Sequence, residues 1–230
     1  KVLDFGCGSG SFTEMLYSKG RDVYGCDADI SLVENFRNKT KKAKYAIVPV
    51  SGELPYKSNF FDCVVMMGVL EHVLDERKTL AEIHRVLRKG GAVYIYGLNK
   101  GLFGFLDTGN IKFRFPKLHK FLYKYFYNES MYKKEFILKK KHGMIGDVTI
   151  GRNWHTHYSR KDLVKLFGNK FRLEKYWLYS FTLPILLALD FVYASIFKRE
   201  SKFLIWMARM DQKIKLGNLS YSFVAKCKKI

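Results

Sequence analysis

The sequence predicts an α/β fold built on a doubly wound, mostly parallel sheet. Along the first hundred residues, short apolar runs alternate with segments in which apolar residues recur at helical spacing. Such alternation implies right-handed crossovers, which bring the loops after the strands to one edge of the sheet, beyond the carboxyl ends. Those loops hold glycines and acidic residues. We therefore expect a ligand site at that edge.

The first expected strand, Val2–Phe5, runs into a turn that contains three alternating glycines. Glycine lets the backbone turn tightly and approach a ligand without obstruction by a Cβ atom. Residues 11–18 then read as a helix. The spacing is G-x-G-x-G, whereas a dinucleotide site uses G-x-G-x-x-G to place a helix N-terminus at the pyrophosphate. The turn therefore favours an adenosyl ligand without a pyrophosphate.

Residues 24–27 end the second expected strand, and the last of them is a carboxylate, Asp27. It follows the glycine turn by about the distance at which an acid binds the ribose of an adenosyl ligand. A ribose diol could donate two hydrogen bonds to this carboxylate. The order of strand, glycine turn, helix, strand and acid is more specific than any one of these features alone.

The pattern continues to the end of the first hundred residues. A buried strand is expected at Cys63–Met67, and the loop 68–73 follows its carboxyl end. Apolar residues at helical spacing predict a helix over 76–87. Lys89–Gly91 is expected to stop this helix, and 92–97 to form a further strand.

These motifs, in this order, resemble the class I S-adenosylmethionine (SAM)-dependent methyltransferases of the broad small-molecule group. The resemblance covers residues 1–100. The motifs that carry it are LDFGCGSG (3–10), YGCD (24–27), ELPY with FFD (53–62), GVLEHV (68–73) and RVLRKGG (85–91). The resemblance implies a Rossmann-like seven-stranded sheet with an antiparallel last strand, a helical insertion or cap, and SAM as the cofactor.

The resemblance also implies which residues bind the cofactor. They are Asp4, Gly6, Cys7, Gly8, Gly10, Asp27, Ala28, Ser51, Gly52 and Met67. The three glycines are expected to pack under the methionine and ribose parts of SAM, Asp27 to bind the ribose hydroxyls, and Met67 to line the cofactor. Ser51 and Gly52 are expected to border the adenine, although many relatives have an Asp in that loop and this chain has none.

Three histidines are candidate general bases. The sulfonium of SAM makes its methyl carbon electrophilic, so the enzyme positions a nucleophile and removes a proton if that nucleophile is a hydroxyl. His72 follows the fourth strand, and His155 and His157 lie in a segment expected to fold back over the pocket. His72 could instead be a structural residue of its loop. The H-x-H pair has no carboxylate or cysteine at ligand spacing, so no metal is expected.

Glu71-His72, together with the later residues 98–100, is similar to the O-methyltransferases of ubiquinone synthesis. Those enzymes carry E-x-x-E-H around a divalent ion, and here Gly68 replaces the first acid. The replacement argues against metal assistance and weakens the case for a prenylated phenol as acceptor. Hydroxyls of lipid-linked or surface sugars remain an equal alternative, because the unmatched residues 101–154 are where a substrate lid would be built.

Positive charge is concentrated in the second part of the chain. Residues 1–99 hold 14 Lys and Arg against 12 Asp and Glu, whereas residues 100–230 hold 27 against 9. The basic part also contains aromatic clusters at 112–115 and 121–127. It could be a solvated face over an aromatic core, or a surface for an anionic membrane or lipid-linked substrate. Nucleic acid is disfavoured, because residues 68–71 lack the N/D-P-P-Y/F run of base methylases.

We expect three regions. Residues 1–100 form the SAM-binding core, 101–157 a basic aromatic insertion that serves as a substrate lid, and 158–230 complete the fold with an apolar helical hairpin and closing strands at 171–179 and 221–228. The apolar stretch 181–197 falls short of the ~20 residues of a membrane span and contains Asp190. With residues 203–207 it should form a hairpin that caps the pocket, in preference to lying in a membrane interface.

The composition fits this division. The 230 residues, 48% of them apolar, can bury one α/β core with an elaboration. The four cysteines show no paired spacing, which indicates a reduced, cytoplasmic protein, with peripheral contact at the inner face of the membrane as an extension. Lys1 already enters a strand, so a truncated N-terminus is expected.

The function expected is transfer of a methyl group from SAM to a small-molecule or lipid-linked acceptor, on oxygen. Two alternatives remain open: a SAM-binding module without catalysis, and a nicotinamide-dependent oxidoreductase. The sequence indicates no oligomeric state.

Overall fold

The computed structural model describes residues 1–29, 32–34, 44–48, 53–101, 107, 110, 114–126, 155–197 and 199–230. The chain divides into two compact units. The first comprises residues 1–97, 158–177 and 224–230, and the second comprises residues 98–157 and 178–223. The segment 158–177 and the last seven residues therefore belong with the unit that contains the glycine turn.

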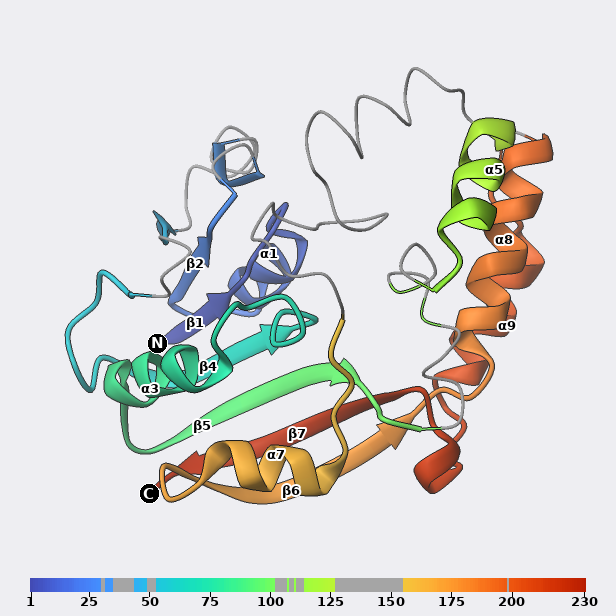
Figure 1. The fold of residues 1–230 in the computed structure, drawn as a ribbon. Coiled ribbons are helices and arrows are strands. Elements are labelled where there is room, and N and C mark those ends of the chain that lie inside the picture. The colour runs from blue at the N-terminus through green and yellow to red at the C-terminus, as the bar shows by residue number, and fades with distance from the viewer. Residues whose placement is uncertain are drawn as a thin grey trace. The chain divides into compact units, whose positions relative to one another are not determined.

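A seven-stranded sheet with the order β3-β2-β1-β4-β5-β7-β6 forms the frame of the first unit (Figure 1). Its strands are β1 (Val2–Phe5), β2 (Val23–Asp27), β3 (Lys44–Ile47), β4 (Phe61–Met67), β5 (Leu87–Leu98), β6 (Phe171–Tyr179) and β7 (Ser222–Lys229). The first five strands pair in parallel, and the arrow of β7 runs against its two neighbours (Figure 1). This arrangement confirms the predicted mostly parallel sheet with an antiparallel last strand.

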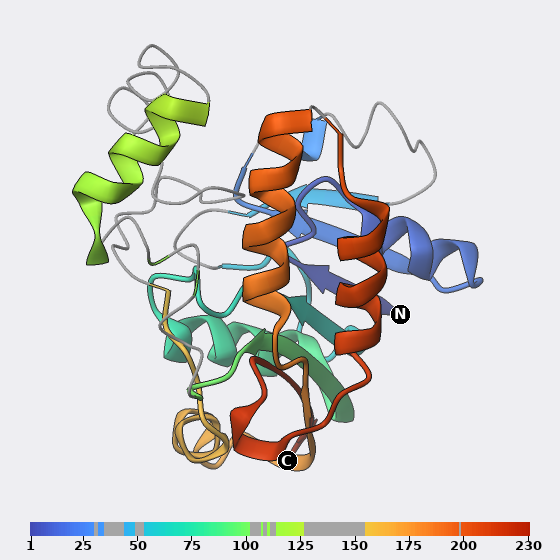
Figure 2. The same cartoon turned by 90° about the vertical axis from the view of Figure 1, so that its right-hand side faces the viewer.

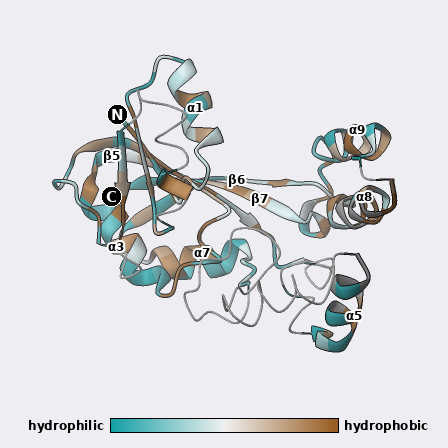
Figure 3. Cartoon of the chain, turned by 90° about the horizontal axis from the view of Figure 1, so that it is seen from above, coloured by the Kyte–Doolittle hydropathy of each residue, from teal (hydrophilic) through white to brown (hydrophobic). Residues whose placement is uncertain are grey.

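Three helices of the first unit are α1 (Ser11–Ser18), α3 (Glu76–Val86) and α7 (Arg160–Phe167). The carboxylate of Asp75 begins α3 by accepting a 2.9 Å hydrogen bond from the amide of Lys78. Ser159 and Asp162 form a reciprocal capping box at the start of α7. Both α3 and α7 have a hydrophobic and a hydrophilic side (Figure 3). Their apolar sides pack inward, as the helical spacing of the sequence predicts.

The predicted helix stop at Lys89–Gly91 is wrong. Helix α3 ends at Val86, and Leu87 already has extended backbone, with φ −77° and ψ 136°. Strand β5 begins there because Leu87 pairs with Phe61 of β4, and a register shift follows before Cys63 pairs with Ala92. The residues read as a stop therefore lie inside an irregular part of β5.

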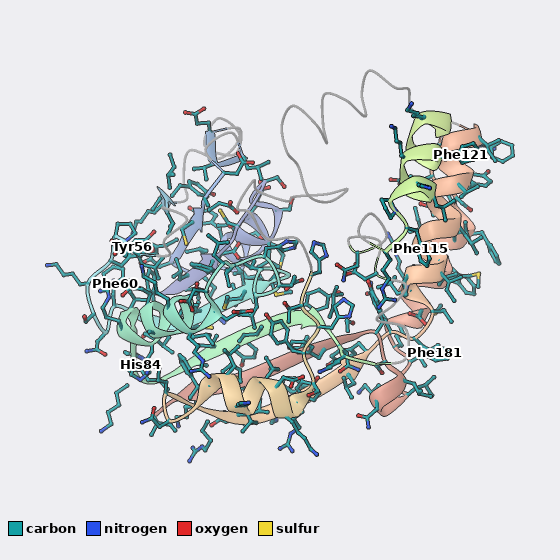
Figure 4. All side chains as sticks on the ribbon, in the orientation of Figure 1. Tyr56, Phe60, His84, Phe115, Phe121 and Phe181 are labelled. Carbon is teal, nitrogen blue, oxygen red and sulfur yellow. The ribbon has the colours of Figure 1, made fainter. Side chains whose placement is uncertain are left out.

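Buried side chains of the central strands form the core of the first unit. They include Leu3, Phe61, Val64, Met66, Leu87 and Ile95, each at most 1% exposed. Consecutive buried residues such as Val64, Val65 and Met66 are typical of parallel strands that are covered on both faces. Tyr56 and Phe60 (Figure 4) belong to an aromatic cluster beside this core, with parallel rings 6.2 Å apart.

The second unit contains helices α5 (Pro116–Phe126), α8 (Leu183–Phe197) and α9 (Lys202–Asp211), and the short 3-10 helix η3 (Gly217–Leu219). Helices α8 and α9 pack as a hairpin (Figure 2), which confirms the predicted helical pair. Across the residues that the structure describes, no helix has the length and hydropathy needed to cross a membrane. Most of the proposed lid, residues 102–106 and 127–154 among them, lies outside the described residues.

Candidate functional site

The glycine turn lies at the carboxyl end of β1 and is held against the end of β2. The amides of Gly6 and Cys7 both donate to the carbonyl oxygen of Cys26, over 2.8 and 3.0 Å. Gly6, Gly8 and Gly10 all have positive φ, at +75°, +51° and +80°. Residues with a Cβ rarely adopt this backbone, which explains why glycine occupies all three positions.

The carboxylate of Asp27 faces this turn. Its Oδ2 accepts a 2.7 Å hydrogen bond from the amide of Gly8, and its Oδ1 accepts a 3.0 Å bond from the amide of Asp29. A carboxylate has about four lone-pair positions, so both oxygens can still accept hydrogen bonds from a diol. The turn and the acid, 19 residues apart in sequence, are therefore brought into direct contact.

Two of the glycines have different surroundings. A Cβ atom at Gly6 would lie 2.4 Å from Cγ2 of Val69, so the loop after β4 packs directly on this position. At Gly8, an added Cβ would have no atom of the described residues outside its immediate neighbours within 4 Å. Gly6 thus permits close packing of the chain on itself, whereas Gly8 borders open space beside Asp27, where a ligand can approach the backbone.

Asp4, in the middle of β1, is a buried acid next to this space. It is 1% exposed, and the hydroxyl of Thr13 donates a 2.6 Å hydrogen bond to its Oδ2. Burial raises the pKa of Asp4 to about 6; the Thr13 hydrogen bond opposes this shift, and the negative charge of Asp27 adds to it. Two neighbouring acids give the site a negative potential, which favours a cationic ligand.

The two cysteines of this region are structural. The thiols of Cys7 and Cys26 are buried, and burial raises the pKa of each well above its usual value. Both therefore remain neutral thiols at physiological pH and are poor nucleophiles. Cys7 can contribute to a ligand site through its backbone, which is part of the glycine turn.

The remaining predicted cofactor residues are placed as follows. Ala28 follows β2 directly, beside Asp27. Met67 is the last residue of β4, as it is of the expected strand Cys63–Met67, and it is 39% exposed. Ser51 and Gly52, expected near the adenine, lie outside the described residues.

The loop after β4 contains His72. The amide of His72 donates to the carbonyl oxygen of Val69 over 2.9 Å, which closes a tight turn. Gly68 has φ +68°, a conformation that disfavours the acid expected at this position from the E-x-x-E-H pattern. The hydroxyl of Tyr158 donates to the carbonyl oxygen of Leu70 over 3.2 Å, so this loop is held by the residue that follows His157 in the chain.

His155 and His157 meet a shared acid within the second unit. Nδ1 of His155 and Nε2 of His157 lie 3.2 and 3.0 Å from the same oxygen, Oδ2 of Asp107, which is 3% exposed. The side-chain amide of Asn110 also donates to Oδ2 of Asp107, over 3.1 Å. The sequence has no carboxylate at ligand spacing beside the H-x-H pair, and the fold brings one to it from a distant part of the chain.

Sequence reasoning missed Asp107 because it lies 48 and 50 residues before the two histidines. The sequence held one signal for Asp107: acids are rare in residues 100–230. Both imidazoles approach one carboxylate oxygen at hydrogen-bond distance. Within the described part of the chain, no three His, Cys, Asp or Glu side chains are arranged to hold a metal ion.

A family model described as "Methyltransferase domain" matches residues 3–95. The chain is 35% identical over 104 residues to the ubiquinone biosynthesis O-methyltransferase of Pelagibacter ubique, covering 44% of this chain and 43% of that protein. It is 30% identical over 116 residues to a ubiquinone/menaquinone biosynthesis C-methyltransferase of Pectobacterium carotovorum, covering 47% and 46%. The chain thus matches less than half the length of these relatives.

Solved structures resemble the whole chain in fold. A SAM-dependent methyltransferase from Methanosarcina mazei has a TM-score of 0.57 and 21% identity, covering 100% of this chain and 92% of that one. The MccD protein has a TM-score of 0.60 and 17% identity, covering 100% and 90%. At these identities the similarity shows a shared fold and says nothing of activity.

Proposed function

We propose, on the premise that residues 3–95 are a class I methyltransferase domain, that this chain transfers a methyl group from SAM to an acceptor molecule. The observation that carries the proposal is the contact between the amide of Gly8 and the carboxylate of Asp27, beside open space. The carboxylate of Asp27 can accept hydrogen bonds from an adenosyl ligand, and the space beside Gly8 leaves room for that ligand.

The residues present fit SAM. Asp27 would accept hydrogen bonds from the ribose hydroxyls, and the positive-φ glycines would let the ligand lie on the backbone. The buried acid Asp4 supplies negative charge toward a ligand that carries a sulfonium and an ammonium group. Cys7, Ala28 and Met67 would contribute backbone and apolar surface, and Ser51 and Gly52 would border the adenine. When bound, SAM supplies an electrophilic methyl carbon.

We propose that the acceptor atom is an oxygen of a small or lipid-linked molecule. The similarity to ubiquinone O-methyltransferases supports oxygen, although a relative of comparable identity is named as a C-methyltransferase. An oxygen acceptor requires a proton to leave as its bond to carbon forms. His72, His155 and His157 are the candidate bases.

Asp107 would position the two later histidines. If each imidazole donates its N–H to Oδ2 of Asp107, His155 keeps Nε2 and His157 keeps Nδ1 as the proton-accepting nitrogen. This hydrogen bonding supports His155 and His157 as bases more strongly than their sequence positions did.

We extend the proposal to peripheral contact with an anionic membrane at its cytoplasmic face. The support is the uneven charge, 27 Lys and Arg against 9 acids after residue 99. Such contact would bring a lipid-linked acceptor within reach of the enzyme. A small water-soluble acceptor would not need it.

Two measurements test the proposal in sequence. Calorimetric titration with SAM, its demethylated product and NADH identifies the ligand; binding of NADH alone would establish a nicotinamide-dependent oxidoreductase. Incubation with methyl-labelled SAM and small-molecule or lipid extracts then tests transfer. SAM binding without transfer to any fraction would establish a binding module instead of an enzyme. The base is then identified by comparing the rate of methyl transfer in three variants, with the extract that accepts the label as substrate. The variants are His72→Ala, His155→Ala and His157→Ala.

A further inference from the structure

We propose that the α8–α9 hairpin of the second unit is a membrane-binding surface whose outer apolar residues insert into the interface of an anionic lipid bilayer. This inference deepens the membrane contact in the proposed function and does not depend on methyl transfer. The sequence analysis favoured a different role for the hairpin, as a cap over the substrate pocket. The described contacts do not test that cap.

One side of α8 is a continuous exposed apolar stripe. Ile185, Leu189, Val192 and Ile196 are between 40% and 61% exposed. Their spacing, i, i+4, i+7 and i+11, places all four on one face of the helix. Leu186 is buried, so the helix has an inner side as well as this outer one.

Helix α9 presents a second apolar stripe. Phe203, Trp206 and Met210, at i, i+3 and i+7, are all exposed, and Phe203 reaches 64%. The rings of Phe203 and Trp206 stack with their centroids 6.1 Å apart. Trp is enriched at the level of lipid headgroups, and Trp and Phe are typical of the apolar face of helices that lie in a membrane interface. Two neighbouring helices therefore expose large apolar side chains, and contact of such side chains with water is unfavourable.

The hairpin uses two of its acids internally. Asp211, 2% exposed, accepts hydrogen bonds of 2.8 to 3.0 Å from the amides of Phe181 and Thr182 and from the Thr182 hydroxyl. Oδ1 of Asp190 accepts a 2.8 Å hydrogen bond from the amide of Ser201, at the start of α9. These two carboxylates therefore accept hydrogen bonds from backbone amides at the N-terminal ends of the two helices.

The remaining charge of the hairpin is positive. Residues 181–216 contain six Lys and Arg, at 198, 199, 202, 209, 213 and 215, against three acids, of which only Glu200 is not bound as described above. Basic residues flanking an apolar face are typical of helices that lie in an anionic membrane interface. The same charge disfavours a second copy as the partner, because two basic surfaces would face each other.

Helix α5 of the same unit has similar chemistry. Leu118 and Phe121 of this helix, and Phe115 just before it, are exposed. Figure 4 labels Phe115 and Phe121. The helix contains three lysines and no acid. It strengthens the choice of an anionic surface as the partner of this unit. At 15 residues, α8 is too short to span a bilayer, so the hairpin would lie in the interface plane.

Co-sedimentation of the full chain with lipid vesicles tests this assignment. We expect binding to vesicles of phosphatidylcholine with 30% phosphatidylglycerol to exceed binding to pure phosphatidylcholine by at least about tenfold, and to weaken as salt is raised. The double variant F203S/W206S should lose at least about tenfold in affinity for the anionic vesicles. Equal binding to both vesicle types, or unchanged binding of the variant, would overturn the proposal.

A matched control separates this surface from general stickiness. L74S and V164S each remove an exposed apolar side chain of the first unit, and both should bind anionic vesicles as the wild type does. Circular dichroism and SAM calorimetry should be unchanged in F203S/W206S, so failure of the membrane assignment is distinguishable from failure of the SAM proposal. If light scattering shows a dimer that F203S/W206S dissociates, the partner is a second copy and the proposal is wrong.

The position of Trp206 gives an independent readout. Brominated lipids quench tryptophans that enter the acyl region, so vesicles of this kind should quench part of the fluorescence of the bound wild type. W206F should keep vesicle binding but lose that quenching, although Trp154 and Trp177 remain. Quenching of equal size in W206F would show that the hairpin does not insert.

Discussion

The amide of Gly8 donates a 2.7 Å hydrogen bond to Oδ2 of Asp27, so the turn after β1 and the acid at the end of β2 are fixed relative to each other. Their positions are also set by the parallel pairing of β1 with β2, which aligns Phe5 with Cys26. A ligand that uses both groups meets a site that is already assembled. Such preorganisation lowers the entropic cost of binding.

Replacing Asp27 with alanine should weaken SAM binding by at least about tenfold, because hydrogen bonds to a charged group are worth ~1.5 to 3 kcal/mol. Calorimetry measures the affinity. The matched control is Asp22→Ala, which removes an exposed acid that precedes β2 and pairs with Lys44. Unchanged affinity in the Asp27 variant, with or without an effect of Asp22→Ala, would contradict the ribose role.

Gly8→Ala should remain folded but bind SAM poorly. The added Cβ meets no atom of the described part of the chain within 4 Å, yet it enters the space beside Asp27 and imposes about 1 to 2 kcal/mol of strain at φ +51°. Gly20→Ala is the control, since Gly20 has φ +73° and equally open surroundings after α1. Both variants should lose similar thermal stability, and only Gly8→Ala should lose affinity. If Gly8→Ala and Gly20→Ala bound SAM with equal affinity, the ligand would not lie beside Gly8.

Much of the first unit could be predicted from sequence because its signals are local. The strand and helix at 2–5 and 11–18 have the predicted bounds, and the glycine turn and Asp27 meet as expected. The helix stop failed because a pairing partner 26 residues away, Phe61, drew Leu87 into a strand. Local propensity does not contain that tertiary information.

The stability of the protein should depend on Asp4 in a specific pH range. Because its pKa rises from 3.8 to about 6 on folding, the folded chain holds a proton that the unfolded chain releases between those values. The contribution of Asp4 to the free energy of unfolding therefore falls as the pH rises from about 4 to 6, and stays low above it.

Asp4→Asn tests this pH dependence. The amide is isosteric and its oxygen can still accept the Thr13 hydrogen bond. The variant should gain on the order of 2 kcal/mol relative to the wild type at pH 8 and little at pH 4, as measured by urea unfolding. A stability difference that is the same at both pH values would show that Asp4 is not protonated on folding in this range.

Asp211→Ala should destabilise the hairpin of the second unit. It would leave the amides of Phe181 and Thr182 without their carboxylate acceptor, at a cost of about 1 to 3 kcal/mol. Hydrogen exchange should become faster over residues 181–197. Glu200→Ala, at an exposed acid beside the same helices, is the control and should leave exchange unchanged. Equal protection in both variants would show that the cap is not needed.

The polar contacts of the second unit could not be predicted from sequence. The hairpin itself was expected from its apolar runs, but Asp211 binds a helix start 29 and 30 residues earlier, and Asp107 meets His155 and His157 across about 50. Side-chain hydrogen bonds at such separations leave no periodic pattern. Only the fold brings these residues together.

Calorimetric titration of the purified chain with SAM tests the central claim most directly, with NADH as the reference ligand. We predict saturable binding of SAM and of its demethylated product at one site, reduced at least about tenfold by Asp27→Ala and unaffected by Asp22→Ala. No detectable heat with either sulfur ligand, from a chain that is folded by circular dichroism, would contradict it.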